Sequence, residues 1–168
     1  MARRKTPGGT PAVAALQSAE VAHTLHPYET ASGGWGPGAQ YGLEAASALG
    51  LDPAVIFKTL VVEAGDRHAV AVVPVACILD LRAFAAALGA KKAVLAGAAV
   101  AERITGYVVG GISPLGQKRA LPTIVDVRAV DLPAIYVSAG RRGLQVELSP
   151  HDLVRLTRAT VAAIARDS

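Results

Sequence analysis

Cysteine and histidine are scarce in this sequence, and their scarcity excludes several kinds of site. The one cysteine, Cys77, cannot form a disulfide within the chain, so we expect a cytoplasmic protein. Four histidines are present, and the H-x-x-H of His23 and His26 would place its two rings on opposite faces of a strand. A zinc ion needs ligands that converge, so we expect no metal.

Long apolar runs and the common cofactor-binding motifs are also missing. Charges, glycines or prolines interrupt every apolar run well before the length of a membrane span, and the segment "MARRKTPGGTP" lacks the apolar stretch of a secretory signal. No phosphate-binding P-loop, dinucleotide-binding fingerprint or G-x-S-x-G nucleophile motif occurs. We therefore expect no membrane association and no cofactor.

The composition is that of a compact globular domain. Hydrophobic residues make up 52% of the 168 residues and charged residues 18%, which argues against a disordered chain. This length suits one domain that can bury its own core. We expect a disordered basic tail over residues 1–9 and a single domain over residues 10–168.

The predicted helices and strands do not alternate regularly along the chain. Pairs of adjacent strands occur as well as single strands between helices, so strict β-α-β alternation fails. We expect an α+β fold, of mixed α/β character, in which helices surround a curved mixed β-sheet with a barrel-like core. The expected helices span residues 10–20, 41–50, 80–89, 98–105 and 149–166, and the expected strands span residues 21–28, 55–63, 68–75, 91–97, 123–127, 134–138 and 144–148.

The stretch "TGYVVGGISPLGQKR", residues 105–119, is unusually rich in glycine and contains no acid, histidine or cysteine. Glycine lets main-chain N–H groups approach a ligand closely, so one interpretation is a loop whose backbone wraps a substrate. The other is a long turn between two elements.

Lys58 stands out in the strand "VIFKTLVVE", because both faces of that strand are otherwise largely apolar. A lysine there is costly unless its ammonium reaches water, a partner or a ligand. It either extends to solvent from an edge position or supplies a point charge in a cleft, suited to a phosphate or a developing oxyanion.

Three further features each allow a functional and a structural interpretation. Cys77 has apolar neighbours, which favours a buried structural residue over a nucleophile. Tyr28 and Tyr41 flank a loop around Trp35, and they either offer a stacking surface or hold that loop in place. Four basic clusters either form one phosphate-binding surface or remain separate solvated turns; they are Arg3 to Lys5, Lys91 and Lys92, Lys118 and Arg119, and Arg141 and Arg142.

The segments "FKTLVV", "AVVPV", "LDLRAFAAALGAKK", "TGYVVGGISPLGQKR" and "IYVSAGRRG" resemble the YbaK/EbsC family, which is similar to the editing domain of bacterial prolyl-tRNA synthetases. The resemblance runs from about Thr10 to the last residue. It implies an enzyme, a trans-acting deacylase that clears cysteine wrongly attached to proline tRNA. Its partners would be aminoacylated tRNA and, by the same resemblance, prolyl-tRNA synthetase.

The resemblance also implies individual roles, with an essential lysine at Lys58 and a loop that cradles the substrate. We expect the substrate's own thiol to attack the ester while the loop's N–H groups stabilise the oxyanion. The expected catalytic residues are Lys58, Gly110 and Gly111; the expected substrate-binding residues are Tyr28, Thr59, Ile112, Ser113, Pro114, Ser138 and Gln145; and the basic residues expected on the tRNA body are Lys118, Arg119, Arg141 and Arg142.

Two departures from the family pattern keep other functions open. The loop after Tyr28 is longer and richer in glycine, and Gln145 stands where these deacylases often carry an aspartate. One alternative is a module of the same fold that binds tRNA or an aminoacyl-adenosine-like ligand without turnover. Another is a deacylase for tRNA misacylated with alanine or serine.

Overall fold

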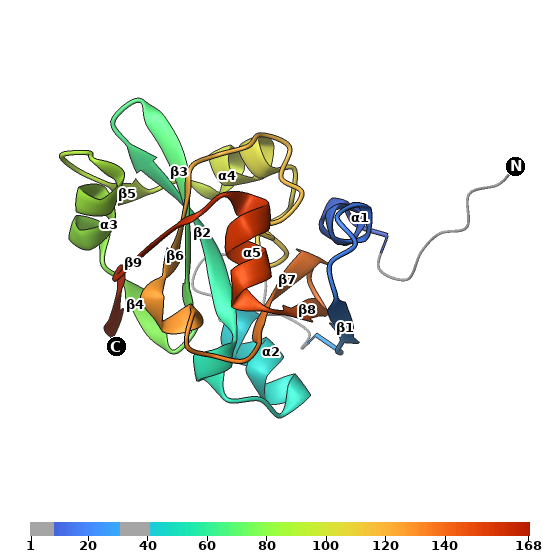
Figure 1. Cartoon of the computed structure of the whole chain (residues 1–168). Helices are drawn as coiled ribbons and strands as arrows, with labels where there is room; N and C mark the ends of the chain where they lie inside the picture. Colours follow the sequence, from blue (N-terminus) through green and yellow to red (C-terminus); the bar gives the residue numbers. More distant parts are fainter. Residues whose placement is uncertain (1–8, 31–40) are drawn as a thin grey trace, which may run out of the picture.

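The computed structural model describes residues 9–30 and 41–168 (Figure 1). The expected N-terminal tail and the loop around Trp35 therefore lie almost wholly outside the described residues. Within them the chain forms five α-helices, two short 3₁₀ helices and ten strands. These are α1 (Pro11–Ser18), β1 (His23–Pro27), α2 (Tyr41–Leu49), η1 (Pro53–Val55), β2 (Phe57–Ala64), β3 (Arg67–Pro74), β4 (Cys77–Leu79), α3 (Leu81–Leu88), β5 (Val94–Leu95), α4 (Ala98–Thr105), β6 (Thr123–Asp126), η2 (Val127–Ala129), β7 (Ile135–Arg141), β8 (Leu144–Leu148), α5 (Pro150–Thr157), β9 (Thr160–Ala162) and β10 (Ala165–Asp167).

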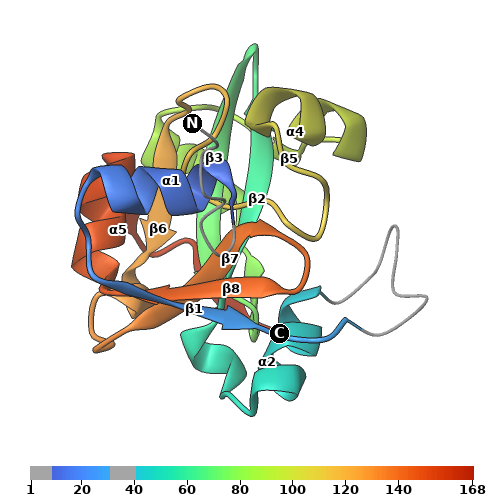
Figure 2. The same ribbon diagram turned by 90° about the vertical axis from the view of Figure 1, so that its right-hand side faces the viewer.

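The expected mixed α+β class is confirmed, with the strands arranged in three sheets. The largest sheet has the order β5-β2-β3-β6-β9 and is mixed: β2 and β3 form an antiparallel hairpin, whereas β6 pairs in parallel with β3 and with β9. A second sheet, β1-β8-β7, is antiparallel and crosses in front of β2 and β3 (Figure 2), and a third pairs β10 with β4. Over the described residues no sheet closes on itself, so the core is layered and not a closed barrel.

The alternation of side chains along β3 divides the core into two parts. Val70 and Val72 face the β1-β8-β7 sheet and pack with α1 and α5, whereas Ala69, Ala71 and Val73 face the opposite side and pack against α3. Successive residues of a strand point to opposite faces, so a strand that is covered on both sides must be apolar throughout. This explains the nearly unbroken apolar run at residues 69–75.

Local capping signals set the helix starts as the sequence predicts. The side chains of Thr10, Asp80 and Ser149 each accept a hydrogen bond from a main-chain N–H in the first turn of α1, α3 and α5. Gly89 ends α3 in the left-handed conformation that glycine adopts without strain.

The prediction that the last helix reaches Arg166 is wrong. α5 ends at Thr157, with Arg158 in the left-handed region at φ +54°, and the chain continues as β9 and β10. Leu153, Leu156, Thr160 and Ile164 have helical spacing, but Thr160 and Val161 are β-branched and favour the strand that adds to β6. Ile164 is then fully buried against α3.

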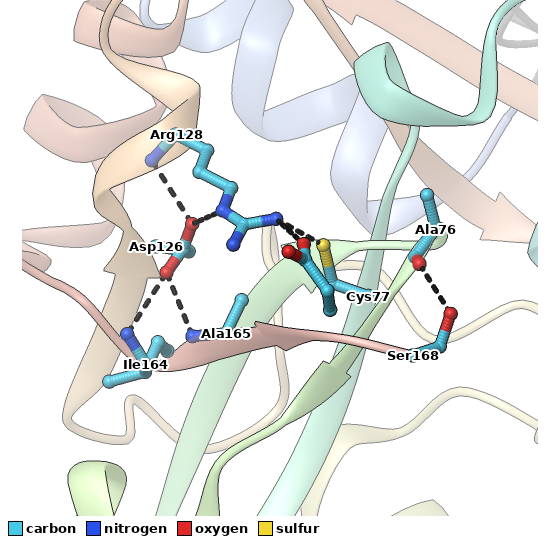
Figure 3. Close-up of polar contacts among 8 residues, drawn as sticks. Ala76, Cys77, Asp126, Arg128, Ile164, Ala165 and Ser168 are labelled. Atoms are coloured by element: carbon cyan, nitrogen blue, oxygen red, sulfur yellow. Dashed lines mark hydrogen bonds and ion pairs between the residues drawn. The ribbon is translucent and has the colours of Figure 1, made fainter.

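Asp126 holds this final segment in place (Figure 3). Its side chain is 1% exposed, and Oδ1 accepts hydrogen bonds from the N–H groups of Ile164 and Ala165, both at 2.9 Å. Oδ2 accepts from the N–H of Arg128 at 3.0 Å. The Arg128 guanidinium then spans to Asp167 on β10, at 3.0 Å, and to the Cys77 sulfur on β4, at 2.7 Å. Arg128 and Asp126 therefore connect the pair formed by β10 and β4 to β6. Neither β4 nor β10 is predicted from the sequence.

Candidate active site

A cavity of about 900 Å³ opens along one edge of β2. β5 pairs with this edge only at Val62 and Glu63, so the preceding residues, 56–61, border the cavity. Residues of α2, of α4 and the loop after it, and of β7 and β8 form the remaining walls; Figure 2 shows α4 and α2 near opposite ends of β2. The volume lies within the range of small-molecule sites.

Lys58 lies on this open edge and lines the cavity, so the two positions that its strand allowed, an edge and a cleft, occur together. The residue is half-buried, and within the described residues its ammonium makes no hydrogen bond or ion pair. Burial lowers the pKa of Lys58 from its ordinary value, and the charge of Cys77 opposes this shift weakly. No carboxylate of the described residues forms an ion pair with the Lys58 ammonium.

Two lining side chains, Thr59 and Gln145, contain polar atoms that lack a partner. Thr59 Oγ1 and Gln145 Oε1 are buried and accept no hydrogen bond within the described part of the chain, and Gln145 is 6% exposed. A buried acceptor without a donor costs about 1–3 kcal/mol, so such atoms are usually satisfied by a ligand or water. Both atoms are available to accept a hydrogen bond from an N–H or O–H group of a ligand or of water.

Tyr28 and Ser138, also expected at the site, line the same cavity. The main-chain N–H of Tyr28 donates to the Gly143 carbonyl at 2.9 Å, which fixes it against the β7–β8 turn. Ser138 Oγ accepts from the Gly140 N–H at 3.2 Å. Ser138 is cross-strand partner of Gln145, so these two side chains share one face of the β1-β8-β7 sheet.

The glycine loop contributes Gly110 and Ile112 to the cavity. Gly110 has φ +94°, and a Cβ there would lie 2.9 Å from the Tyr41 ring, so only glycine allows the loop to pass beneath that ring. A Cβ on Gly111 would lie 2.7 Å from the main chain of Arg141, which explains a second glycine. The Gly111 N–H donates to the Val108 carbonyl at 2.9 Å, whereas the Gly110 N–H has no partner within the described residues.

Ser113 and Pro114, which we expected at the substrate, belong to the same stretch but are buried and do not line the cavity. Ser113 Oγ accepts from the Leu115 N–H at 3.2 Å. Tyr107 donates from its hydroxyl to the Leu115 carbonyl at 2.6 Å, and burial raises the pKa of Tyr107 to about 12. This part of the stretch therefore anchors the loop that carries Gly110.

Arg142, expected on the tRNA body, points into the protein. Its side chain is 5% exposed, Nη2 lies 3.1 Å from Glu44 Oε2 on α2, and its guanidinium stacks 5.1 Å from the centre of the Tyr41 ring. Tyr41 in turn contacts Gly110 and lines the cavity. Arg142 thus connects the β7–β8 turn to the wall of the cavity.

The other expected tRNA-body residues, Lys118, Arg119 and Arg141, are exposed and do not line the cavity. Lys118 follows the glycine loop, and its N–H donates to the Thr105 carbonyl at the end of α4 at 2.8 Å. These side chains are free to contact a polyanion beside the cavity.

Sequence reasoning missed several lining residues, of which Glu102 is charged. Glu102 Oε2 accepts from the Val109 N–H at 2.8 Å and so shapes the start of the glycine loop. One signal was available, because an acid in the last turn of a helix opposes the helix dipole. The apolar lining residues Leu43, Leu95 and Val108 carried no such signal.

The described cavity lining differs from that of a cysteine–histidine or metal-dependent site in the residue types it contains. The lining residues include no cysteine or histidine, and the described part of the chain holds no cluster of three or more potential metal ligands. No helix described here has the length and apolar character needed to cross a bilayer.

Comparisons with known proteins identify a related family, a related sequence and related structures. The model of the aminoacyl-tRNA editing domain family matches residues 37–156. A protein of Enterococcus faecalis, EbsC, described as a proposed Cys-tRNA(Pro)/Cys-tRNA(Cys) deacylase, is 37% identical over 166 residues, covering 98% of each chain. The crystal structure of the protein APE2540 superposes with a TM-score of 0.82 at 25% identity, covering 93% of this chain and 99% of that one. A proposed trans-editing enzyme for prolyl tRNA synthetase has a TM-score of 0.78 at 22% identity, covering 96% and 98%. The chain belongs to the aminoacyl-tRNA editing domain family, the YbaK/EbsC family that its sequence resembles.

Proposed function

We propose that this protein is a trans-acting deacylase that clears cysteine from mischarged proline tRNA in the cytoplasm. The observation that carries the proposal is the cavity itself: a lysine without a counter-ion and two unpartnered acceptors, with no cysteine or histidine among the lining residues that the structure describes. Such a site suits a substrate that supplies its own nucleophile. The 37% identity to EbsC supports the choice of a cysteine ester.

The proposed reaction begins with attack of the substrate's thiol sulfur on the ester carbonyl carbon. A C–S bond forms, the ester C–O bond breaks, the thiol proton passes to solvent, and the terminal ribose hydroxyl leaves with a proton from water. Water then opens the resulting four-membered thiolactone to free cysteine. Because attack within one molecule can reach an effective molarity on the order of 10⁵ M, holding the ester in a bent pose supplies much of the rate.

The protein's part is to bind this pose and to stabilise charge on the carbonyl oxygen. We assign this stabilisation to the Lys58 ammonium and to the unpartnered N–H of Gly110. One preorganised donor lowers the activation free energy by about 3 kcal/mol. Thr59 Oγ1 and Gln145 Oε1 would accept from the substrate's α-ammonium and ribose hydroxyl groups. The role of Gly111 is then to allow the loop's close approach, since its own N–H is used by Val108.

The body of the tRNA would lie over the exposed basic side chains beside the cavity, Lys118, Arg119 and Arg141. Charge reversal at Lys118 and Arg119 should raise KM and make binding less dependent on salt, because fewer counter-ions are released. An unchanged salt dependence of binding would indicate that these residues lie in ordinary solvated turns and do not contact tRNA.

The test is a deacylation assay with one tRNA body carrying different amino acids. Cysteinyl-tRNA should be cleaved much faster than seryl-tRNA, whose hydroxyl is a far weaker nucleophile near neutral pH, or alanyl-tRNA, which has none. Alkylation of the substrate thiol should stop cleavage even if the ester still binds. Comparable cleavage of alanyl-tRNA would refute the thiol mechanism and indicate an attacking water; binding without turnover of any ester would indicate a non-catalytic module.

A further inference from the structure

The mouth of the cavity carries an exposed apolar surface that the reaction above does not use. Among the exposed large hydrophobic residues of the described chain, Leu95 and Val108 are the two most exposed, at 53% and 56%, and both line the cavity. We call these two residues the apolar ledge. Leu43 on α2, 40% exposed, also lines the cavity.

The main chain holds the ledge rigidly, so its exposure is part of the fold. Leu95 is paired with Val62 of β2, and the next N–H, of Ala96, donates to the Val61 carbonyl at 2.9 Å. The carbonyl of Val108 accepts from Gly111, and the N–H that follows it is bonded to Glu102. Exposed apolar side chains that line a cavity add to the apolar surface that a ligand can cover.

Three exposed lysines belong to the chain segments that carry the ledge. Lys91 and Lys92 are exposed and are separated from β5 by Ala93 alone. The main-chain N–H of Lys118 donates to the Thr105 carbonyl at the end of α4, three residues before Val108. Within the described part of the chain none of these lysines makes an ion pair. Glu102 is the acidic residue closest in sequence to both Leu95 and Val108, and its carboxylate accepts a hydrogen bond from the Val109 N–H.

An apolar ledge with exposed lysines on the same chain segments matches one end of the proposed substrate. The 3′ end of a tRNA is single-stranded, so each nucleotide offers a flat apolar base and one phosphate. Proteins bind single strands by pairing apolar contact to the bases with a basic track for the backbone. In the proposed reaction the ester carbonyl lies at Lys58 on β2, so the preceding nucleotides must leave the cavity past other lining residues, among them Leu95 on the neighbouring β5.

We propose that Leu95 and Val108, with Lys91 and Lys92, form the binding site for the unpaired nucleotides that precede the 3′-terminal nucleoside of the tRNA. This inference rests on the proposed deacylation and deepens it, since it assigns the nucleotide contacts at the same cavity. The ledge packs against the bases, and the two lysines neutralise the phosphates between them.

The experiment compares two cysteine esters, one on full-length tRNA and one on adenosine alone. Leu95→Ser with Val108→Ser should raise KM for the tRNA ester at least tenfold more than KM for the adenosine ester, with kcat for the tRNA ester little changed. Lys91→Glu with Lys92→Glu should lower the salt slope of tRNA binding by about 1 per lysine. Val127→Ser is the matched control, because Val127 is 42% exposed and lies away from the cavity.

Equal KM changes for the two esters, or none, would overturn the inference. A second measurement separates this result from failure of the proposed reaction. Fluorescence anisotropy can measure the binding of an oligonucleotide that has the last three nucleotides of tRNA and no attached amino acid. Its affinity should fall about tenfold in the Leu95→Ser/Val108→Ser variant and stay unchanged in Val127→Ser. That binding does not depend on turnover, so its loss would support the ledge even if no ester were cleaved, and its persistence would refute it.

Discussion

Replacing Asp126 by alanine should destabilise the protein without altering the cavity. Asp126 is buried, its carboxylate accepts three main-chain hydrogen bonds, and it does not line the cavity. Alanine would leave the N–H groups of Ile164 and Ala165 without their acceptor while Ile164 stays in the core. The change therefore tests whether one side chain holds β9 and β10 in place.

The size of the effect follows from the three hydrogen bonds. Each bond to a charged acceptor contributes about 1.5–3 kcal/mol net, and an orphaned buried donor costs about 1–3 kcal/mol. Arg128 can recover a bond to water because it is exposed, and removing a buried charge returns some desolvation energy. We expect a loss of about 3 kcal/mol, which in a domain of this size lowers Tm by roughly 6–12 °C. Asp126→Asn, which keeps one oxygen for Ile164 and Ala165, should lose about half as much.

Thermal unfolding measures the loss, and amide hydrogen exchange locates it. Asp131→Ala is the control, because Asp131 is exposed and close in sequence; it should change the free energy of unfolding by less than about 0.5 kcal/mol. Exchange at Ile164 and Ala165 should accelerate most in the Asp126 variant. A Tm equal to that of the control, or unchanged protection of these two amides, would refute the reasoning.

Three further predictions concern the cavity and its neighbours. Lys58→Met should lower deacylation at least about a hundredfold. Burial lowers the pKa of Lys58 in the folded protein, so between the folded and unfolded pKa values the unfolded chain binds more protons and the stability of the wild type rises with pH. Urea unfolding should show that the variant is equally or more stable at pH 7 and lacks this rise. Arg142→Met should cost about 3 kcal/mol and raise KM, because it removes the ion pair to Glu44 and the stack on Tyr41; additive effects of Arg142→Met and Glu44→Gln in a double-mutant cycle would contradict the coupling. Cys77→Ala should turn over within about twofold of wild type, and a covalent cysteinyl adduct on that sulfur in the native protein would disprove its dispensability.

Strong local signals explain which parts of the fold could be predicted from sequence. Caps at Thr10, Asp80 and Ser149 and the glycine at Gly89 act within one helical turn, so they work without tertiary context. The C-terminal segment had a helical pattern at Thr160 and Ile164, but an open sheet edge at β6 and the buried carboxylate of Asp126 stabilise the strand instead. That competition depends on partners more than thirty residues away, which no local pattern contains.

The candidate site also combines features that the sequence predicts with features that only tertiary contacts determine. The sequence by itself determined that Lys58 must find water or a ligand, because an ammonium in an apolar strand is costly wherever the strand lies. For the glycine-rich residues 105–119 it left two interpretations open, a loop that wraps a substrate and a long turn. Only the tertiary structure decided that β5 leaves the edge of β2 open beside Lys58, that Arg142 points inward to Glu44, and that Ser113 is buried and does not line the cavity. Burial and pairing are set by segments that meet in space, so the same basic or polar residue can face a ligand, the solvent or the core.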